Sequence, residues 1–241
     1  MAPYPMRHEM RGGKTVGMRR RTWGWYALAV AVMAGVTADV LADGPLRRLD
    51  WTIHAFCDAH VRGARFSAAH ALTQFGQRGV IAGFVLLPLA VLGAVRARSA
   101  RPVLVPVAVV ALLSLLQAGV KSVIPRTYPS GGVDVLWKHG DAYPSGHTLN
   151  GFLLVWVGLE LLVVVVPALD RRLTARGRRD FALATGFLTG AALTVADEHW
   201  LTDVLFSLAL GPVLLAWLVA AEPFTRRLWA GEPVRGRYPR I

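Results

Sequence analysis

Long runs of apolar residues, separated by short polar segments, dominate this chain of 241 residues. Each run holds roughly the 20 residues that an α-helix needs to cross the hydrocarbon core of a bilayer. The runs lie near residues 22–42, 79–95, 102–120, 149–169, 181–197 and 200–221. They predict an all-α integral membrane protein built as a six-helix bundle, in which the shortest run, 181–197, could instead be a buried helix.

The first apolar run follows about twenty polar and basic residues, and no small-residue cleavage site clearly follows it. We therefore interpret it as a retained membrane span and not as a signal peptide. This gives three parts: a basic tail over 1–21, a six-span domain over 22–221, and a second basic tail over 222–241.

Basic residues account for the net charge of +12, and their placement indicates the orientation of the spans. They gather in the two tails and in the connections between spans two and three and between spans four and five, all of which fall on one side of a six-span topology. By the positive-inside rule, that side is the cytoplasm, and both termini lie there. A nucleic-acid partner is not expected, because these charges lie in tails and short connections without interleaved aromatic residues.

The segment from Leu46 to His70 falls on the outer side. Leu49, Ile53, Phe56 and Cys57 recur at helical spacing, which predicts an amphipathic helix lying on the outer surface. The three histidines of this segment, His54, His60 and His70, lack the spacing of metal ligands, and we interpret them as interfacial polar residues. The chain has one cysteine, so an internal disulfide and a cysteine-based metal site are excluded.

The stretch Tyr143-Pro144-Ser145-Gly146-His147 marks the point where a polar loop ends and the fourth apolar run begins. A helix starting near Ser145 directs free N–H groups and the positive end of its dipole at the loop, which suits an anion. Ser145, Gly146 and His147 are therefore candidates for a phosphate cradle. A serine cap with a chance histidine in the first turn explains the pentapeptide equally well.

Ionisable residues at the outer ends of other spans extend this candidate site. Lys121 ends the third span, and His199 lies between the fifth and sixth. His199 and Asp203 are four residues apart and are expected to share a helix face, so the carboxylate can hold one ring nitrogen and leave the other free as a nucleophile. His147 is then available as a general acid. Lys121 and Arg126 could neutralise a phosphoryl group.

Pro144-Ser145-Gly146-His147 and His199-x-x-x-Asp203 resemble two motifs of the type 2 phosphatidic acid phosphatases, a family of membrane lipid phosphatases. Lys121 is similar to the lysine of that family's first motif, and the six-span topology resembles the family's. The resemblance covers roughly residues 70–221. It implies a phosphatase that needs no metal or other cofactor, in which His199 forms a phosphohistidine, Asp203 orients it and His147 protonates the leaving oxygen. It also implies that Lys121, Ser145 and the Gly146 amide hold the phosphate.

Two arginines of the family pattern are absent. The family's first motif is Lys, six residues, then Arg-Pro, but here Tyr128-Pro129 follows at that spacing. The third motif normally reads Ser-Arg five residues before its histidine, and here Ala192-Leu193 stand there. Arg126 is the expected substitute, and Arg78 or Lys138 are further possibilities.

Three functions remain open on this reading. The first is a lipid phosphatase in the plasma membrane, with its site on the periplasmic or exterior face and a polyprenyl phosphate or diphosphate, phosphatidic acid or phosphatidylglycerol phosphate as substrate. The second is an inactive family member that binds a lipid phosphate or a membrane partner, for which the absent arginines would be the reason. A transporter or channel is disfavoured, because the spans carry almost no charge at mid-membrane.

Overall fold

The computed structural model describes residues 14–224, and it is built from helices. The long elements are α1 (Lys14–Leu41), α2 (Pro45–His60), α3 (Ala64–Thr73), α5 (Leu87–Ala97), α6 (Arg101–Val123), α7 (Gly146–Val165), α8 (Ala175–Val195) and α9 (Leu201–Ala221). The short ones are η1 (Gln74–Gly76), α4 (Arg78–Val80), η2 (Ile81–Leu86), η3 (Pro129–Gly131) and η4 (Pro167–Arg171). Extended pairing in this part of the chain is limited to an isolated bridge between Arg126 and Leu136. The all-α prediction is confirmed.

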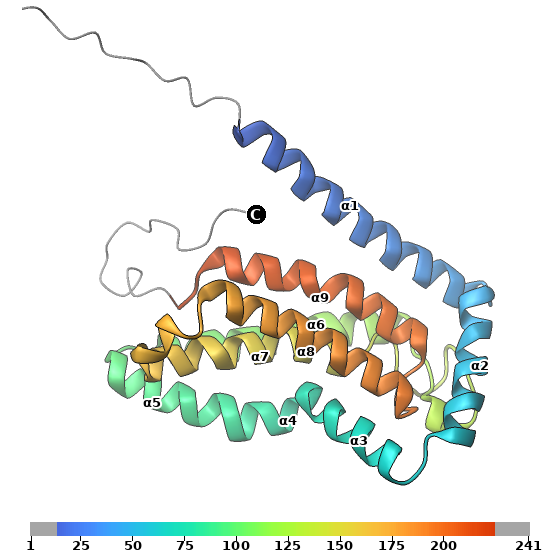
Figure 1. Cartoon of the computed structure of the whole chain (residues 1–241). Helices are drawn as coiled ribbons and strands as arrows, with labels where there is room; N and C mark the ends of the chain where they lie inside the picture. The colour runs from blue at the N-terminus through green and yellow to red at the C-terminus, as the bar shows by residue number, and fades with distance from the viewer. Residues whose placement is uncertain (1–13, 225–241) are drawn as a thin grey trace, which may run out of the picture.

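Helix α7 is the centre of the bundle. It packs against α5, α6, α8 and α9, and side chains around its whole circumference are buried, including Asn150, Phe152 and Trp156. Small residues allow this close packing, because a Cβ added at Gly186 of α8 or Gly211 of α9 would overlap the ring of Phe152. By contrast, α1 leans away from the bundle toward its N-terminal end (Figure 1).

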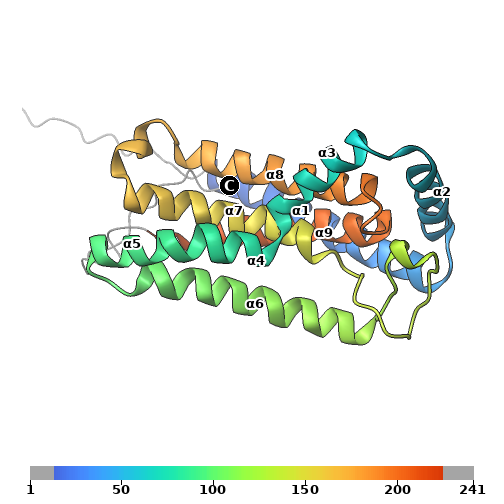
Figure 2. The same ribbon diagram turned by 90° about the horizontal axis from the view of Figure 1, so that it is seen from below.

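Among the described residues, five helical segments are long and apolar enough to cross a membrane: Trp23–Leu41, Arg78–Ala97, Arg101–Val123, Gly146–Val165 and Leu201–Ala221. They correspond to five of the six predicted spans. The remaining predicted span, 181–197, corresponds to α8. This helix has charged residues in its first two turns, which lower its hydropathy. It nevertheless runs beside α7 and α9 in the bundle (Figures 1 and 2). Its crossing of the membrane stays a prediction.

The first and second spans differ in detail from the sequence prediction. The first helix begins at Lys14 and not near residue 22, because its lysine and arginine residues are good helix formers and continue the same helix. The rest of the N-terminal tail and most of the C-terminal tail lie outside the described residues. In the second span, residues 81–86 form a π-helix directly before Pro88, which widens the backbone where the proline ring would meet a preceding carbonyl.

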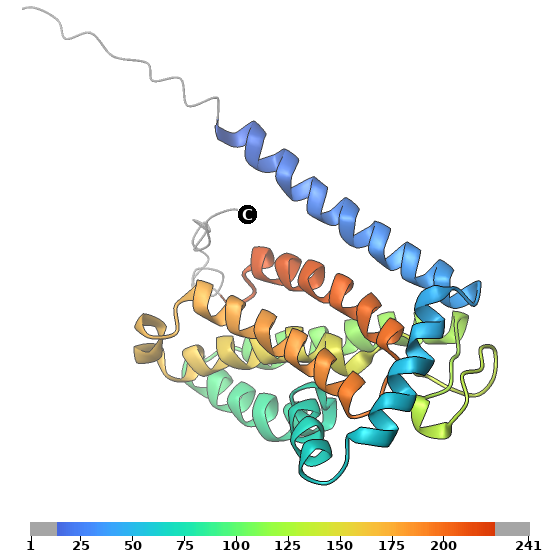
Figure 3. The ribbon, with the colours of Figure 1, turned by 45° about the vertical axis from the view of Figure 1, so that its right-hand side comes forward.

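The outer segment 46–70 is not one helix. Gly63, with a φ of +57°, separates α2 from α3, and α2 crosses the end of the bundle (Figure 3). The expected apolar stripe is also only partly covered: Phe56 is 60% exposed, whereas Asp50, which does not belong to that stripe, is 1% exposed. Asp50 is buried because it pairs with groups of the candidate site.

Candidate functional site

The predicted motif residues meet at one end of the bundle, where α7 begins and the turn between α8 and α9 lies. The imidazole rings of His147 and His199 face each other with their centroids 6.0 Å apart and their planes at 61°. They are 52 residues apart in the sequence, so only the packing of α7 against α8 and α9 brings them together. The structure therefore brings together the two histidines that the sequence named as candidates.

His199 is held by Asp203, as the spacing predicted. Its Nδ1 lies 3.4 Å from Oδ2 of Asp203, and both side chains are almost completely buried. The contact does not arise within one helix, because α9 begins at Leu201 and His199 lies in the preceding turn. The same carboxylate oxygen accepts a bond from the backbone N–H of Trp200 at 3.2 Å, which fixes the turn. The other ring nitrogen, Nε2, has no hydrogen-bond partner within residues 14–224.

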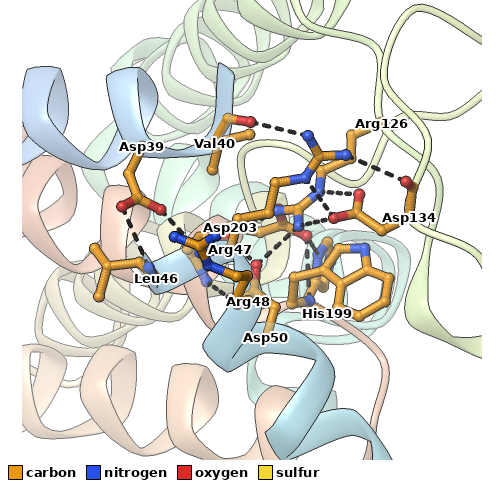
Figure 4. A network of polar contacts seen from close by, with 12 residues as sticks. Asp39, Val40, Leu46, Arg47, Arg48, Asp50, Arg126, Asp134, His199 and Asp203 are labelled. Carbon is orange, nitrogen blue, oxygen red and sulfur yellow. Dashed lines mark hydrogen bonds and ion pairs between the residues drawn. The ribbon is translucent and has the colours of Figure 1, made fainter. Parts of the chain in front are cut away.

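Arg126 lies behind Asp203, and its guanidinium is fully buried (Figure 4). Its Nη1 donates to Asp203 Oδ1 at 2.8 Å and to the Thr202 hydroxyl at 2.6 Å. Nη2 and Nε donate to Asp50 and Asp134 at 2.8 Å each. Burial lowers the pKa of Arg126, but the bonds to these carboxylates outweigh it and raise the pKa, so the guanidinium stays charged.

The expectation that Arg126 replaces a missing phosphate-binding arginine does not fit this placement. An arginine has five N–H donors, and all five of Arg126 are used by carboxylates and Thr202. The physical reason is that three acids surround Arg126, and two of them, Asp50 and Asp203, come from distant segments that the local motif spacing does not reveal. Arg126 supports the site by holding Asp203.

The acids around Arg126 respond differently to burial. Burial raises the pKa of Asp50, although bonds from Thr202 and Arg126 oppose the shift. Burial would also raise the pKa of Asp134, but bonds from Arg126 and Arg47 hold it below its usual value. Arg47 Nε donates to Asp134 Oδ2 at 2.7 Å, and α2, which carries Arg47, is capped in turn by Asp39 through the N–H groups of Leu46 and Arg47 (Figure 4).

Lys121 approaches the site from the last turn of α6. Its Nζ donates to the Asp141 carbonyl and lies 3.7 Å from the Asp141 carboxylate. Tyr128 donates to the same carbonyl at 3.2 Å, and its ring lies 5.2 Å from that of His199. Burial, with Asp141 adding to the effect, raises the pKa of the Tyr128 phenol, so its hydroxyl stays a donor. The position that holds the arginine of the family's first motif is therefore occupied by a neutral tyrosine in contact with His199.

Ser145 and Gly146 form the start of α7. Ser145 is the N-cap: its hydroxyl accepts bonds from the Thr148 N–H at 3.4 Å and the Thr148 hydroxyl at 3.0 Å. Its backbone N–H donates to the Asp203 carbonyl at 3.1 Å, which ties α7 to the His199–Asp203 segment. The capping interpretation of Ser145 is thus met, and the first-turn amides remain the part of this segment that can face an anion.

Residues at the start of the second span also reach the site. The sequence names Arg78 as a possible substitute for a missing arginine, and it does not mark Gln77. Gln77 Oε1 lies 3.1 Å from His147 Nε2. The neighbouring Arg78 donates to Ser114 and Gln117 of α6 at 2.7 Å each. A polar pair at the end of an apolar run was the available signal, but sequence spacing alone does not place it beside His147.

Two histidines of the outer helices hold the turn that carries His199. His54 of α2 lies 2.8 Å from the Asp197 carboxylate, and His70 of α3 lies 2.6 Å from that of Glu198. From the sequence we interpreted these histidines as interfacial polar residues, and the contacts with Asp197 and Glu198 were not predicted. In the part of the chain that is described, no group of three or more His, Cys, Asp or Glu side chains is arranged to hold a metal ion.

Comparison with known proteins agrees with this arrangement. The family model described as "PAP2 superfamily" matches residues 101–227, which is more than half of the chain. The chain belongs to the PAP2 superfamily. A solved structure, the transmembrane PAP2-type phosphatidylglycerolphosphate phosphatase from Bacillus subtilis, matches with a TM-score of 0.58 and 21% identity, over 82% of this chain and 93% of that one. No curated protein matches.

As a PAP2 member with several apolar helices, the chain is a multi-pass membrane protein. The histidines, the aspartate and the lysine that the resemblance marked are present. His147, His199 and Asp203 lie close together, and Lys121 shares the Asp141 carbonyl with Tyr128, whose ring lies beside His199. At the two positions where the pattern has arginine, this member has Tyr128 and Leu193. Leu193 is fully buried, and its carbonyl accepts bonds from the N–H groups of Glu198 and His199, so that position serves the turn.

Proposed function

We propose that this protein is a lipid phosphatase of the plasma membrane that works through a phosphohistidine on His199. The observation that carries the proposal is the pair of imidazoles 6.0 Å apart, one of which is held by a buried carboxylate. At that separation both rings can contact one phosphoryl group, one at phosphorus and the other at the leaving oxygen.

The chemistry follows from these positions. His199 Nε2 attacks phosphorus, the bond from phosphorus to the leaving oxygen breaks, and His147 gives its proton to that oxygen. His147 then takes a proton from water, whose oxygen attacks phosphorus and breaks the P–N bond, which releases phosphate and restores His199. Asp203 stabilises the charge that develops on His199 in the first step. Lys121 and the first-turn amides of α7 neutralise the phosphoryl oxygens, so the scheme includes no metal ion.

A lipid substrate is supported by an apolar groove on the flank of the bundle, one end of which lies near the site. The groove has a volume of about 380 Å³ and lies between α7 and the segment that joins α3 to α5. Its upper end is lined by Gln74 and Phe75, close to Gln77, which contacts His147. An acyl or prenyl chain fits this lining at membrane depth. Polyprenyl phosphates, phosphatidic acid and phosphatidylglycerol phosphate all meet the requirement, and the last is named for the similar Bacillus protein.

The orientation follows from charge. The connections that follow α5 and α7 carry Arg98, Arg171 and Arg172, and they lie at the end of the bundle opposite His199 (Figure 1). By the positive-inside rule, this distribution of charge supports a periplasmic or exterior position for the histidines.

The test is phosphate release from a panel of these lipids by purified protein in detergent containing EDTA, beside His199→Ala. Release that survives EDTA and is lost in the variant is the expected result. The absence of release from every lipid, with wild type and variant alike, would instead favour a member that only binds lipid phosphate, for which Tyr128 and Leu193 in place of arginines would be the reason.

A further inference from the structure

Arg78 presents a guanidinium that is held by neutral groups. Nη1 donates to the Ser114 hydroxyl at 2.7 Å, and Nη2 donates to Gln117 Oε1 at 2.7 Å and approaches Asn150 Oδ1 at 3.5 Å. Its Nε is buried and has no hydrogen-bond partner among residues 14–224. Within the same residues, no carboxylate lies within ion-pair distance of Arg78.

Arg126 and Arg178, which are buried more completely than the half-buried Arg78, have carboxylate partners. Arg126 is paired with three carboxylates, and Arg178 is paired with Glu160 and Asp170. Arg78 is half-buried, its Nε is enclosed without a partner among residues 14–224, and removing part of a cation from water without a counter-charge is costly, so folded proteins pair such groups or bind an anion beside them. Arg78 therefore has the donors and the charge for an anion.

The position of Arg78 indicates that this anion is the phosphoryl group of the substrate. Ser114 and Gln117 lie on the α6 face that continues one turn later to Lys121. Asn150 follows His147 by one turn of α7, and Gln117 Oε1 lies against Gly146, where a Cβ would stand. Gln77, next to Arg78, contacts His147. The guanidinium thus lies beside the start of α7, on the side where α6 brings Lys121.

We propose that Arg78 is a phosphate-binding residue, and that it supplies from the second span the guanidinium that Tyr128 and Leu193 do not. Ser114, Gln117 and Asn150 hold it without neutralising it, which leaves its charge available to the phosphoryl oxygens. The inference rests on the proposed function. The competing explanation is that Arg78 only ties the second span to α6 and α7.

The experiment measures orthovanadate, which mimics a phosphoryl group, on the full-length protein in detergent. The readouts are vanadate inhibition of phosphate release and the vanadate-induced rise in melting temperature, for wild type, Arg78→Gln, Arg78→Lys and Arg62→Gln. Arg62 is the control because its side chain is 71% exposed and lies on an outer segment. We expect Arg78→Gln to weaken vanadate binding and lower kcat by about 100-fold, Arg78→Lys to recover part of both losses, and Arg62→Gln to behave as wild type.

Vanadate affinity unchanged in Arg78→Gln would overturn the inference while leaving the phosphatase intact. If Arg78→Gln does not fold, Arg78→Lys decides: a structural tie predicts wild-type vanadate affinity, and phosphate binding predicts a loss of about tenfold because the paired donors are gone. If vanadate binds in an Arg78-dependent way but no lipid is hydrolysed, Arg78 is confirmed as an anion ligand and the proposed activity is wrong. If wild type neither binds vanadate nor hydrolyses any lipid, both proposals are wrong.

Discussion

Asp203 connects His199 to the buried Arg126, because one of its carboxylate oxygens contacts His199 and the other accepts a hydrogen bond from Arg126. We predict that Asp203→Asn lowers kcat by about 10⁴-fold, as for the orienting carboxylate of a catalytic triad, since an amide cannot stabilise a charged His199. Steady-state phosphate release measures this. Asp58→Asn, at a carboxylate that is 71% exposed, is the matched control. Equal losses in both variants would contradict a specific role for Asp203.

Arg126 acts on stability in this account and not on phosphate. Arg126→Leu leaves buried carboxylates at Asp50, Asp134 and Asp203 without their cation, so we predict a loss of about 3–5 kcal/mol in the free energy of unfolding. Thermal or denaturant unfolding in detergent measures the loss, with Arg62→Leu as the exposed control. A normally stable Arg126→Leu protein that has lost only vanadate affinity would show that Arg126 contacts phosphate after all.

The sequence predicted those side-chain contacts in the site whose two residues lie within a few positions of each other in the chain. Ser145 as a helix cap and Asp203 beside His199 follow from local spacing, and both contacts are present. The environment of Arg126 depends on Asp50, 76 residues away, and no local pattern encodes such a contact. Gln77 and Arg78 lie outside every motif, and they reach the site only because α4 packs against α7.

Helices α2 and α3 each contact the turn between α8 and α9 and stabilise it. His54 and His70 each contact one acid of that turn, and His199 is the next residue. We predict that the double variant His54→Asn/His70→Asn lowers kcat by at least about tenfold while the bundle stays folded, because the turn loses both fixing contacts.

His60→Asn is the control for this variant, because the contacts of the His60 ring within residues 14–224 are with the carbonyl and the stacked ring of Phe56 in its own helix. Turnover and melting temperature are measured together. An unchanged kcat in the double variant, or an equal loss in His60→Asn, would show that the outer helices do not position His199.

Hydropathy predicted the elements better than their ends. The apolar runs correspond to helices, but α1 begins eight residues before the predicted start and α8 six residues before it, because charged residues continue a helix beyond its apolar part. Periodicity over 46–70 did not reveal the break at Gly63, whose positive φ depends on how α3 returns over the turn at 197–198.

At the scale of the whole molecule, the positive-inside rule makes a prediction that cysteine labelling can test. In a Cys57→Ala background, Lys138→Cys should react with a membrane-impermeant maleimide on intact cells, and Arg172→Cys should react only after the membrane is opened. Both side chains are exposed and lie at opposite ends of the bundle, and Cys57 is the chain's single cysteine. The reverse pattern would place the site in the cytoplasm.

The central claim is that His199 attacks phosphorus, and the most direct measurement is to trap the intermediate. The protein is mixed with a lipid phosphate labelled with ³²P, quenched in base within the first turnover and mapped by mass spectrometry. The account predicts phosphate on the ring nitrogen of His199, stable in base and lost in acid, and absent from His199→Ala. Label on another residue, or hydrolysis without any labelled protein under conditions where His147→Ala also accumulates none, would contradict it.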